Sequence, residues 1–139
     1  MQPVSNPTSR RQDLPRRRAL VVMNPAVDRC SPAEIRREVA ERLGPAGWSW
    51  GIAEVKSVAD LDEAAERAVR GECDVVVVAG GDATVARVAR HLVGSETALG
   101  IIPTGRENSI ALGLGIPEDS SLATSLLVED HEAGYLDAL

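Results

Sequence analysis

Short apolar runs alternate with amphipathic segments from residue 19 to the end of the chain. Residues 19–23 and 75–79 are continuously apolar and residues 98–102 nearly so, a pattern typical of parallel strands buried on both faces. Residues 48–52 place Trp48, Trp50 and Ile52 at alternate positions, which predicts a further strand with unequal faces. Residues 135–139 are either a terminal strand or a cut end.

Helix signals fill the intervals between these strands. Residues 31–34, Ser-Pro-Ala-Glu, combine a capping hydroxyl, a proline at the first helical position and a glutamate three residues after the cap. Ile35, Val39 and Leu43 then fall on one stripe of a helix that ends at Gly44. Further helices are expected over 57–69, between Thr84 and Gly94, over 109–114 and over 120–127.

Strands that alternate with helices at this spacing predict a mainly parallel sheet with helices packed on its faces, a three-layer α/β/α fold. The 139 residues suffice for one domain. We therefore expect a basic tail over residues 1–18, followed by a single domain over residues 19–139.

The charge is distributed unevenly along the chain. The net charge is −6, yet the first 18 residues hold five arginines and one aspartate, so the remainder is strongly acidic. An acidic body with 2% aromatic residues excludes broad nucleic-acid binding, which needs clustered cations or stacking platforms. The tail is either a solvated, disordered leader or a segment that contacts an anionic membrane surface.

Cysteine content and hydropathy indicate a cytoplasmic protein. Cys30 and Cys73 have no neighbours at metal-ligand spacing, so we expect no metal site of their own and a reduced environment. The apolar run after Arg18 is five residues long, shorter than a signal-peptide core of roughly 7–15 residues. No stretch approaches the roughly 20 residues of a membrane span. The protein should be soluble, at most peripheral to a membrane.

Unusual residues follow three of the expected strands: Asn24-Pro25, residues 80–84 and residues 103–108. Ligands of open α/β sheets bind at the carboxyl ends of the strands. Gly80 and Gly81 at a strand-to-helix junction allow backbone N–H groups to approach a phosphate. Alternatively, the glycines permit a tight turn while Asp82 or Thr84 caps the following helix.

Residues 78–85, Val-Ala-Gly-Gly-Asp-Ala-Thr-Val, resemble the Gly-Gly-Asp-Gly-Thr signature of the diacylglycerol kinase, sphingosine kinase and NAD kinase superfamily. Asn24-Pro25 matches the same group. Residues 100–117 are similar to the lipid kinase segment Pro-x-Gly-Thr-x-Asn-Asp-x-Ala followed by Leu-Gly-Ile-Pro, which separates lipid kinases from NAD kinases. The resemblance extends over residues 19–139.

The resemblance implies the N-terminal, ATP-binding domain of a diacylglycerol kinase-like lipid kinase, which transfers a phosphoryl group from ATP to a lipid hydroxyl such as that of diacylglycerol. Mg²⁺ would accompany the nucleotide. Family members continue into a second, mainly β domain that supplies the general base, so partners include such a domain or a homo-oligomer. The residues that would bind nucleotide are Asn24, Pro25, Gly80, Gly81, Asp82, Thr84, Gly105 and Asn108.

Asp82 is the one candidate catalytic group, because His91 and His131 are expected to be bystanders. Three substitutions depart from the family pattern. Ala83 replaces a glycine, where a Cβ would cost strain or crowd the phosphates; Arg106 replaces a threonine and Ser109 an aspartate.

These departures leave a catalytically degenerate nucleotide- or partner-binding module as the alternative function. Arg106 is either a new phosphate contact or a solvent-facing charge. The loop over residues 26–29 also lacks the family's usual glycines. A dinucleotide-binding Rossmann domain is disfavoured, because no Gly-x-Gly-x-x-Gly turn follows the first strand.

Overall fold

A computed structural model describes residues 17–25, 30–71 and 73–129. Four strands form one parallel sheet in the order β2-β1-β3-β4. The strands are β1 (Arg18–Met23), β2 (Ser49–Glu54), β3 (Val75–Gly80) and β4 (Ala98–Pro103). The helices are α2 (Pro32–Leu43), α3 (Val58–Arg70), α4 (Asp82–Leu92), α5 (Ser109–Gly113) and α6 (Ser120–Val128).

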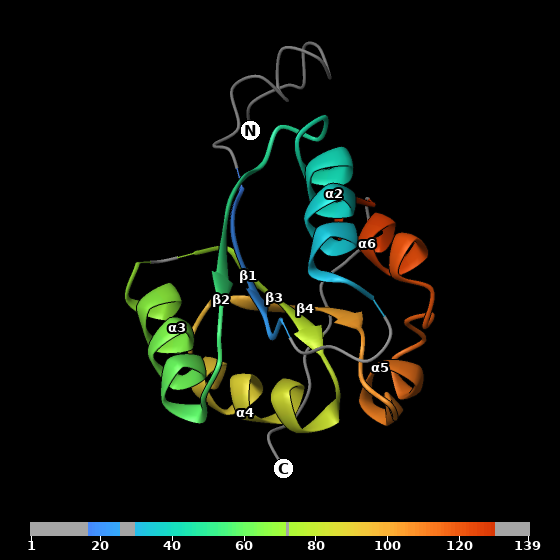
Figure 1. Cartoon of the computed structure of the whole chain (residues 1–139). Coiled ribbons are helices and arrows are strands. Elements are labelled where there is room, and N and C mark those ends of the chain that lie inside the picture. The colour runs from blue at the N-terminus through green and yellow to red at the C-terminus, as the bar shows by residue number, and fades with distance from the viewer. Residues whose placement is uncertain (1–16, 26–29, 72, 130–139) are drawn as a thin grey trace, which may run out of the picture.

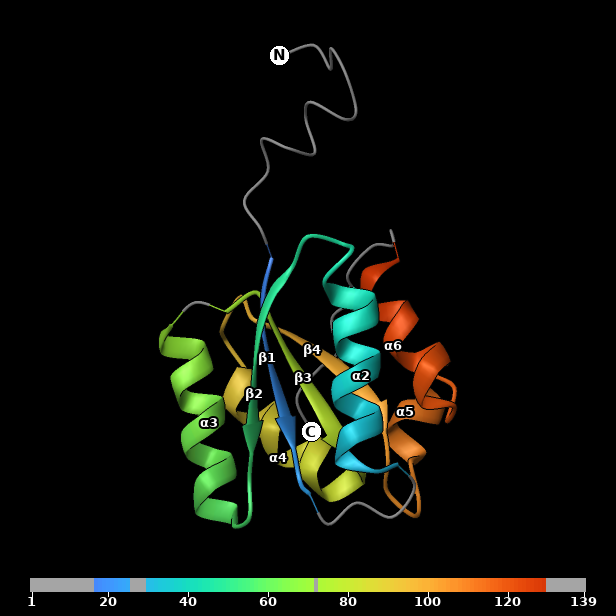
Figure 2. The same ribbon diagram turned by 45° about the horizontal axis from the view of Figure 1, so that its top comes forward.

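Helices cover both faces of the sheet (Figure 1). Helices α2 and α6 pack on one face and α3 and α4 on the other, which the second view also shows (Figure 2). Alternate residues of β1 and β3 enter the two apolar cores, because successive side chains of a strand point to opposite faces. Every residue of β3 is buried. The predicted three-layer α/β/α fold is confirmed.

Helices α2 and α3 begin where local capping chemistry predicts. The Ser31 hydroxyl accepts a hydrogen bond from the Glu34 N–H at 3.1 Å, and Pro32 is the first residue of α2. Ser57 caps α3 in the same way through the Asp60 N–H, also at 3.1 Å. Each cap satisfies one of the N–H groups that a helix start leaves without a partner.

The strand register brings the unusual loops to one edge of the sheet. Met23 pairs with Ala79 across β1 and β3, and Gly80 pairs with Pro103 across β3 and β4. All strands are parallel, so their carboxyl ends lie together at what we call the carboxyl edge. Strand β1 has β2 on one side and β3 on the other. The chain therefore changes direction between β1 and β3, where open α/β sheets bind ligands.

One helix boundary differs from the sequence expectation. Strand β3 continues through Gly80, which pairs with Pro103, and α4 already begins at Asp82. Only Gly81 separates strand from helix, so the expected five-residue loop is a single-residue junction.

Several expectations concern parts of the chain outside the described residues: the tail to residue 16, the loop over 26–29, His131 and the segment 135–139. Within the described ranges, no helix has the length and apolar character needed to cross a membrane.

Candidate functional site

Two glycine-containing segments touch through their backbones at the carboxyl edge. A Cβ added to Gly105 would lie 2.5 Å from the Gly81 Cα, and one added to Gly81 would lie 3.1 Å from the Gly105 Cα. Real Cβ atoms do not tolerate the shorter distance, so side chains are excluded here by packing rather than by backbone conformation. The end of β3 and the loop after β4 are therefore in direct backbone contact, with Gly81 and Gly105 both partly exposed.

Helix α4 starts at this contact without a cap. Gly81 is its N-cap residue, and within the described chain no side chain bonds to the N–H groups of the first turn. Thr84 packs against Gly80 instead, since a Cβ on Gly80 would lie 3.1 Å from the Thr84 Cβ. Neither Asp82 nor Thr84 forms the local cap considered from the sequence. An uncapped helix start beside glycines is suited to an anion such as phosphate.

Asp82 caps a different helix. Its Oδ2 accepts from the Ser109 N–H at 3.0 Å and its Oδ1 from the Ile110 N–H at 2.9 Å. These N–H groups belong to the first turn of α5, which has no cap from Asn108. The carboxylate thus ties α4 to α5 and fixes the loop between β4 and α5 against Gly81.

Asn108 holds that loop from within. It is 3% exposed, its Oδ1 accepts from the Gly105 N–H at 3.1 Å, and its Nδ2 donates to the Gly105 carbonyl at 3.1 Å. The same Nδ2 donates to Glu118 Oε2 at 3.0 Å. The side-chain amide therefore fixes the conformation of the loop at Gly105.

Two participants were not expected from the sequence. Glu118 accepts a hydrogen bond from Asn108, and no local sequence pattern predicts that Asn108 would pair with a carboxylate ten residues away. Thr104 is 1% exposed, donates its N–H to the Gly80 carbonyl at 3.2 Å, and has a buried hydroxyl without a hydrogen-bond partner in the described structure. Its position between Pro103 and Gly105, inside the segment 100–117 that resembles the lipid kinase motif, could have identified it from the sequence.

The three departures from the family pattern lie at the surface. Ala83 is exposed in the first turn of α4 with helical backbone, so the strain considered for this residue is absent. Arg106 and Ser109 are also exposed. Asn24 is exposed and Pro25 half-buried at the end of β1, one residue after the Met23–Ala79 pair. The expected nucleotide-binding residues therefore gather along the carboxyl edge.

Within the described residues, no group of three His, Cys, Asp or Glu side chains converges to form a resident metal site. Both oxygens of Asp82 already accept backbone N–H groups. Mg²⁺ usually binds proteins through one or two carboxylates together with substrate phosphates. The residues would fit a magnesium ion held mainly by the phosphates of a nucleotide, with Asp82 as the carboxylate of the site.

His91 takes part in an ion-pair cluster between α3 and α4. The Arg87 guanidinium donates two hydrogen bonds of 2.8 Å to Asp62, and His91 Nε2 lies 2.9 Å from Asp62 Oδ1. Hydrogen bonding to Arg87, and next to His91, lowers the pKa of Asp62 far below its ordinary value. His91 thus joins two helices away from the carboxyl edge.

Comparison with known proteins identifies relatives of this chain. Residues 18–135 match the family described as "Diacylglycerol kinase catalytic domain". The diacylglycerol kinase of Bacillus subtilis (strain 168) is 31% identical over 123 residues, covering 87% of this chain and 41% of the relative. That of Staphylococcus aureus (strain bovine RF122 / ET3-1) is 30% identical over 121 residues, covering 84% and 38%. The chain spans about two fifths of the length of these curated relatives.

The fold has solved counterparts. A crystal structure of a diacylglycerol kinase from Bacillus anthracis str. Sterne superposes with a TM-score of 0.73 at 24% identity, covering 82% of this chain and 40% of that one. At this identity the likeness concerns the α/β fold.

Proposed function

Because the chain belongs to the diacylglycerol kinase catalytic domain family, we propose that it forms the ATP-binding part of a lipid kinase. The reaction is phosphoryl transfer from ATP to a hydroxyl group of a lipid such as diacylglycerol. The single observation that carries the nucleotide assignment is the uncapped start of α4 at the Gly81–Gly105 contact. There, the first-turn N–H groups and the positive end of the helix dipole lie beside two glycines that carry no side chain.

The proposed roles follow from position. The first-turn N–H groups of α4 bind the phosphates, Thr84 supplies a hydroxyl from the same turn, and Gly105 lines the opposite side. Asn24 and Pro25, at the end of β1, border the switch point where the rest of the nucleotide would lie. Magnesium, when bound with ATP, offsets phosphate charge next to Asp82.

Asp82 acts as a positioning residue in this proposal. Both of its oxygens accept N–H groups of α5, so the carboxylate holds α5 and the loop before it in place. The general base would then come from the part of the longer relatives that lies outside the matched region. We propose that residues 19–139 form one domain, whose partners are this second region and the lipid substrate. The proposed location is cytoplasmic, and the arginine-rich residues 1–18 are proposed as a separate tail.

The proposal is tested by calorimetric titration of the full chain with Mg-ATP, comparing Ala83→Asp with Ala59→Asp. Ala83 and Ala59 are both exposed second residues of a helix, in α4 and α3. A carboxylate at either position favours its helix dipole by about 0.3–1 kcal/mol, so both variants should fold. We expect Ala83→Asp to weaken ATP binding at least tenfold through repulsion of the phosphates, while Ala59→Asp leaves it unchanged.

If the two substitutions weakened ATP binding equally, the start of α4 would not be the phosphate site. Wild-type protein that binds no Mg-ATP would contradict the proposal and leave the degenerate, partner-binding module as the function. Binding that survives both substitutions would place the nucleotide elsewhere on the chain.

A further inference from the structure

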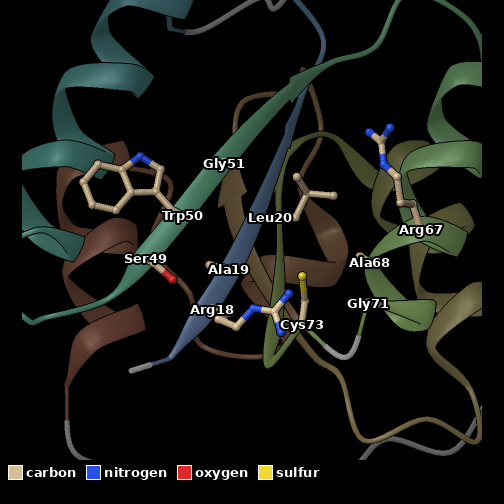
Figure 3. Close-up of a pocket in the computed structure, with 10 residues that line it drawn as sticks. All are labelled: Arg18, Ala19, Leu20, Ser49, Trp50, Gly51, Arg67, Ala68, Gly71 and Cys73. Atoms are coloured by element: carbon tan, nitrogen blue, oxygen red, sulfur yellow. The ribbon is translucent and has the colours of Figure 1, made fainter. Parts of the chain in front are cut away.

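A depression of about 360 Å³ lies at the opposite end of the sheet from the proposed nucleotide site. It is lined by the first residues of β1 and β2 and by the last turn of α3 (Figure 3). We call it the amino-edge pocket. Its lining is Arg18, Ala19, Leu20, Ser49, Trp50, Gly51, Arg67, Ala68, Gly71 and Cys73.

Small side chains on the edge strand create this space. Arg18 pairs with Ser49 and Leu20 with Gly51 across β1 and β2, so at these two positions β2 presents a hydroxymethyl group and a hydrogen to the α3 side. A Cβ added to Gly51 would meet one atom, Leu20 Cδ1, at 3.9 Å. Trp50 points the other way, toward α2 (Figure 3). Leu20 is consequently left half-buried as an apolar floor.

Two guanidinium groups border this floor. Figure 3 shows Arg67 on α3 to the right of Leu20, and Arg18 on β1 below it, next to Cys73. Within the described residues neither arginine forms an ion pair. The nearby Asp74 carboxylate accepts the backbone N–H of Arg18 at 2.7 Å. The last carbonyls of α3 are engaged too, since Gly71 donates to the Arg67 carbonyl and Cys73 to the Ala68 carbonyl. Both side-chain cations remain available to a ligand.

We propose that the amino-edge pocket binds a small organic anion, a carboxylate or phosphate monoester that carries a short aliphatic chain. Guanidinium groups bind either oxyanion through charge-assisted hydrogen bonds. The aliphatic chain would lie on Leu20, in the space that Gly51 leaves open. The pocket is independent of the proposed nucleotide site, because the two lie at opposite ends of the strands.

The test is a titration of the full, ¹⁵N-labelled chain followed by NMR, with butyl phosphate and butyrate as probes and butanol as the uncharged control. We expect saturable shifts of the Leu20, Gly51 and Ala68 amide signals with at least one anion and none with butanol. The signals of Gly81 and Gly105 should not move with the aliphatic anion that binds. The stronger of the two anions identifies the preferred oxyanion.

Three variants separate charge from shape. Arg67→Gln should weaken binding about tenfold, as loss of a charge-assisted hydrogen bond does. Arg70→Gln, in the same last turn of α3 but outside the lining, is the matched control and should leave affinity unchanged. Gly51→Val keeps both arginines and fills the open space, so it should abolish binding while the amide spectrum shows a folded protein.

Four outcomes overturn the proposal: no saturable shifts with either anion, equal shifts with butanol, equal loss in Arg67→Gln and Arg70→Gln, or full binding by Gly51→Val. A fifth is binding to phosphatidylglycerol vesicles without binding of either soluble anion, which would make the arginines a membrane contact. ATP binding is proposed at the carboxyl edge and is measured separately. If the chain does not bind ATP, the test of the amino-edge pocket is unaffected.

Discussion

The two ends of the sheet differ in what surrounds their candidate sites. At the carboxyl edge, Gly81 and Gly105 touch through the backbone and Asp82 bonds to backbone N–H groups. At the amino edge, side chains of Arg18 and Arg67 border a depression beside Gly51. The first site has no room for an added methyl group, whereas the second exists because side-chain volume is missing. Substitutions of glycine should therefore have opposite consequences at the two ends.

Helix polarity sharpens this contrast. Each helix that follows a strand of a parallel sheet starts at the carboxyl edge and, if it returns to the next strand, ends at the amino edge. Arg42, Arg67 and Arg70 stand in last turns, where cations favour the helix dipole. At the carboxyl edge α4 keeps its positive end without a side-chain cap. Under the two proposals, an anion would be bound by backbone N–H groups at one end and by arginine side chains at the other.

The largest effect is expected for Gly105→Ala. Its Cβ would lie 2.5 Å from the Gly81 Cα, so the loop must move away from β3. Overpacking of this kind costs about 1–3 kcal/mol of unfolding free energy, and ATP binding should be lost. Gly113→Ala is the control, since a Cβ there meets no atom within 4 Å. Chemical denaturation and calorimetry measure the two effects; equal stability of both variants would disprove the backbone contact.

The capping role of Asp82 predicts a graded series. Asp82→Ala removes both acceptors of the α5 N–H groups and should lower the free energy of unfolding by about 1 kcal/mol. Asp82→Asn retains one side-chain oxygen and should lose about half as much. Hydrogen exchange of the Ser109 and Ile110 amides should accelerate in the same order. Unchanged exchange at both amides would show that the carboxylate does not hold α5.

At the amino edge, Gly51→Val should increase stability. The strand gains a β-branched residue in open space beside Leu20, and glycine within a strand costs roughly 0.5–1 kcal/mol relative to alanine. Thermal unfolding should rise by a few degrees, against the fall expected for Gly105→Ala. A lower melting temperature would mean that β2 and α3 lie closer together than described.

The smallest effect concerns pH and the α3–α4 cluster. The pKa of Asp62 is lowered from 3.8 by Arg87 and His91, so its ion pairs stabilise the folded state fully above that ordinary value. This contribution is lost as the pH falls through the lower, folded-state pKa. Asp62→Asn should therefore destabilise the protein near neutral pH. In thermal unfolding at different pH values, its melting temperature should also fall less steeply toward acid pH than that of the wild type. If the melting temperatures of wild type and variant changed with pH in parallel, the Asp62 ion pairs would not be the source of this pH dependence.

Most of the fold followed from local sequence patterns. The runs at 19–23, 75–79 and 98–102 became β1, β3 and β4, and the Ser31 and Ser57 starts became α2 and α3. These patterns succeed because strand alternation, caps and helix stripes depend on residues a few positions apart. The boundary of α4 was misplaced, because pairing of Gly80 with Pro103 extends β3 beyond what its own sequence indicates.

The sequence by itself determined the alternation of strands and helices, and with it which loops meet at the carboxyl edge. The tertiary structure decided how those loops are joined: Asp82 caps a helix that begins 27 residues later, and Gly81 excludes a side chain at Gly105. It also decided that Gly51 opens a space between Arg18 and Arg67. Such contacts depend on the register of neighbouring strands, which places residues together only after the sheet has formed.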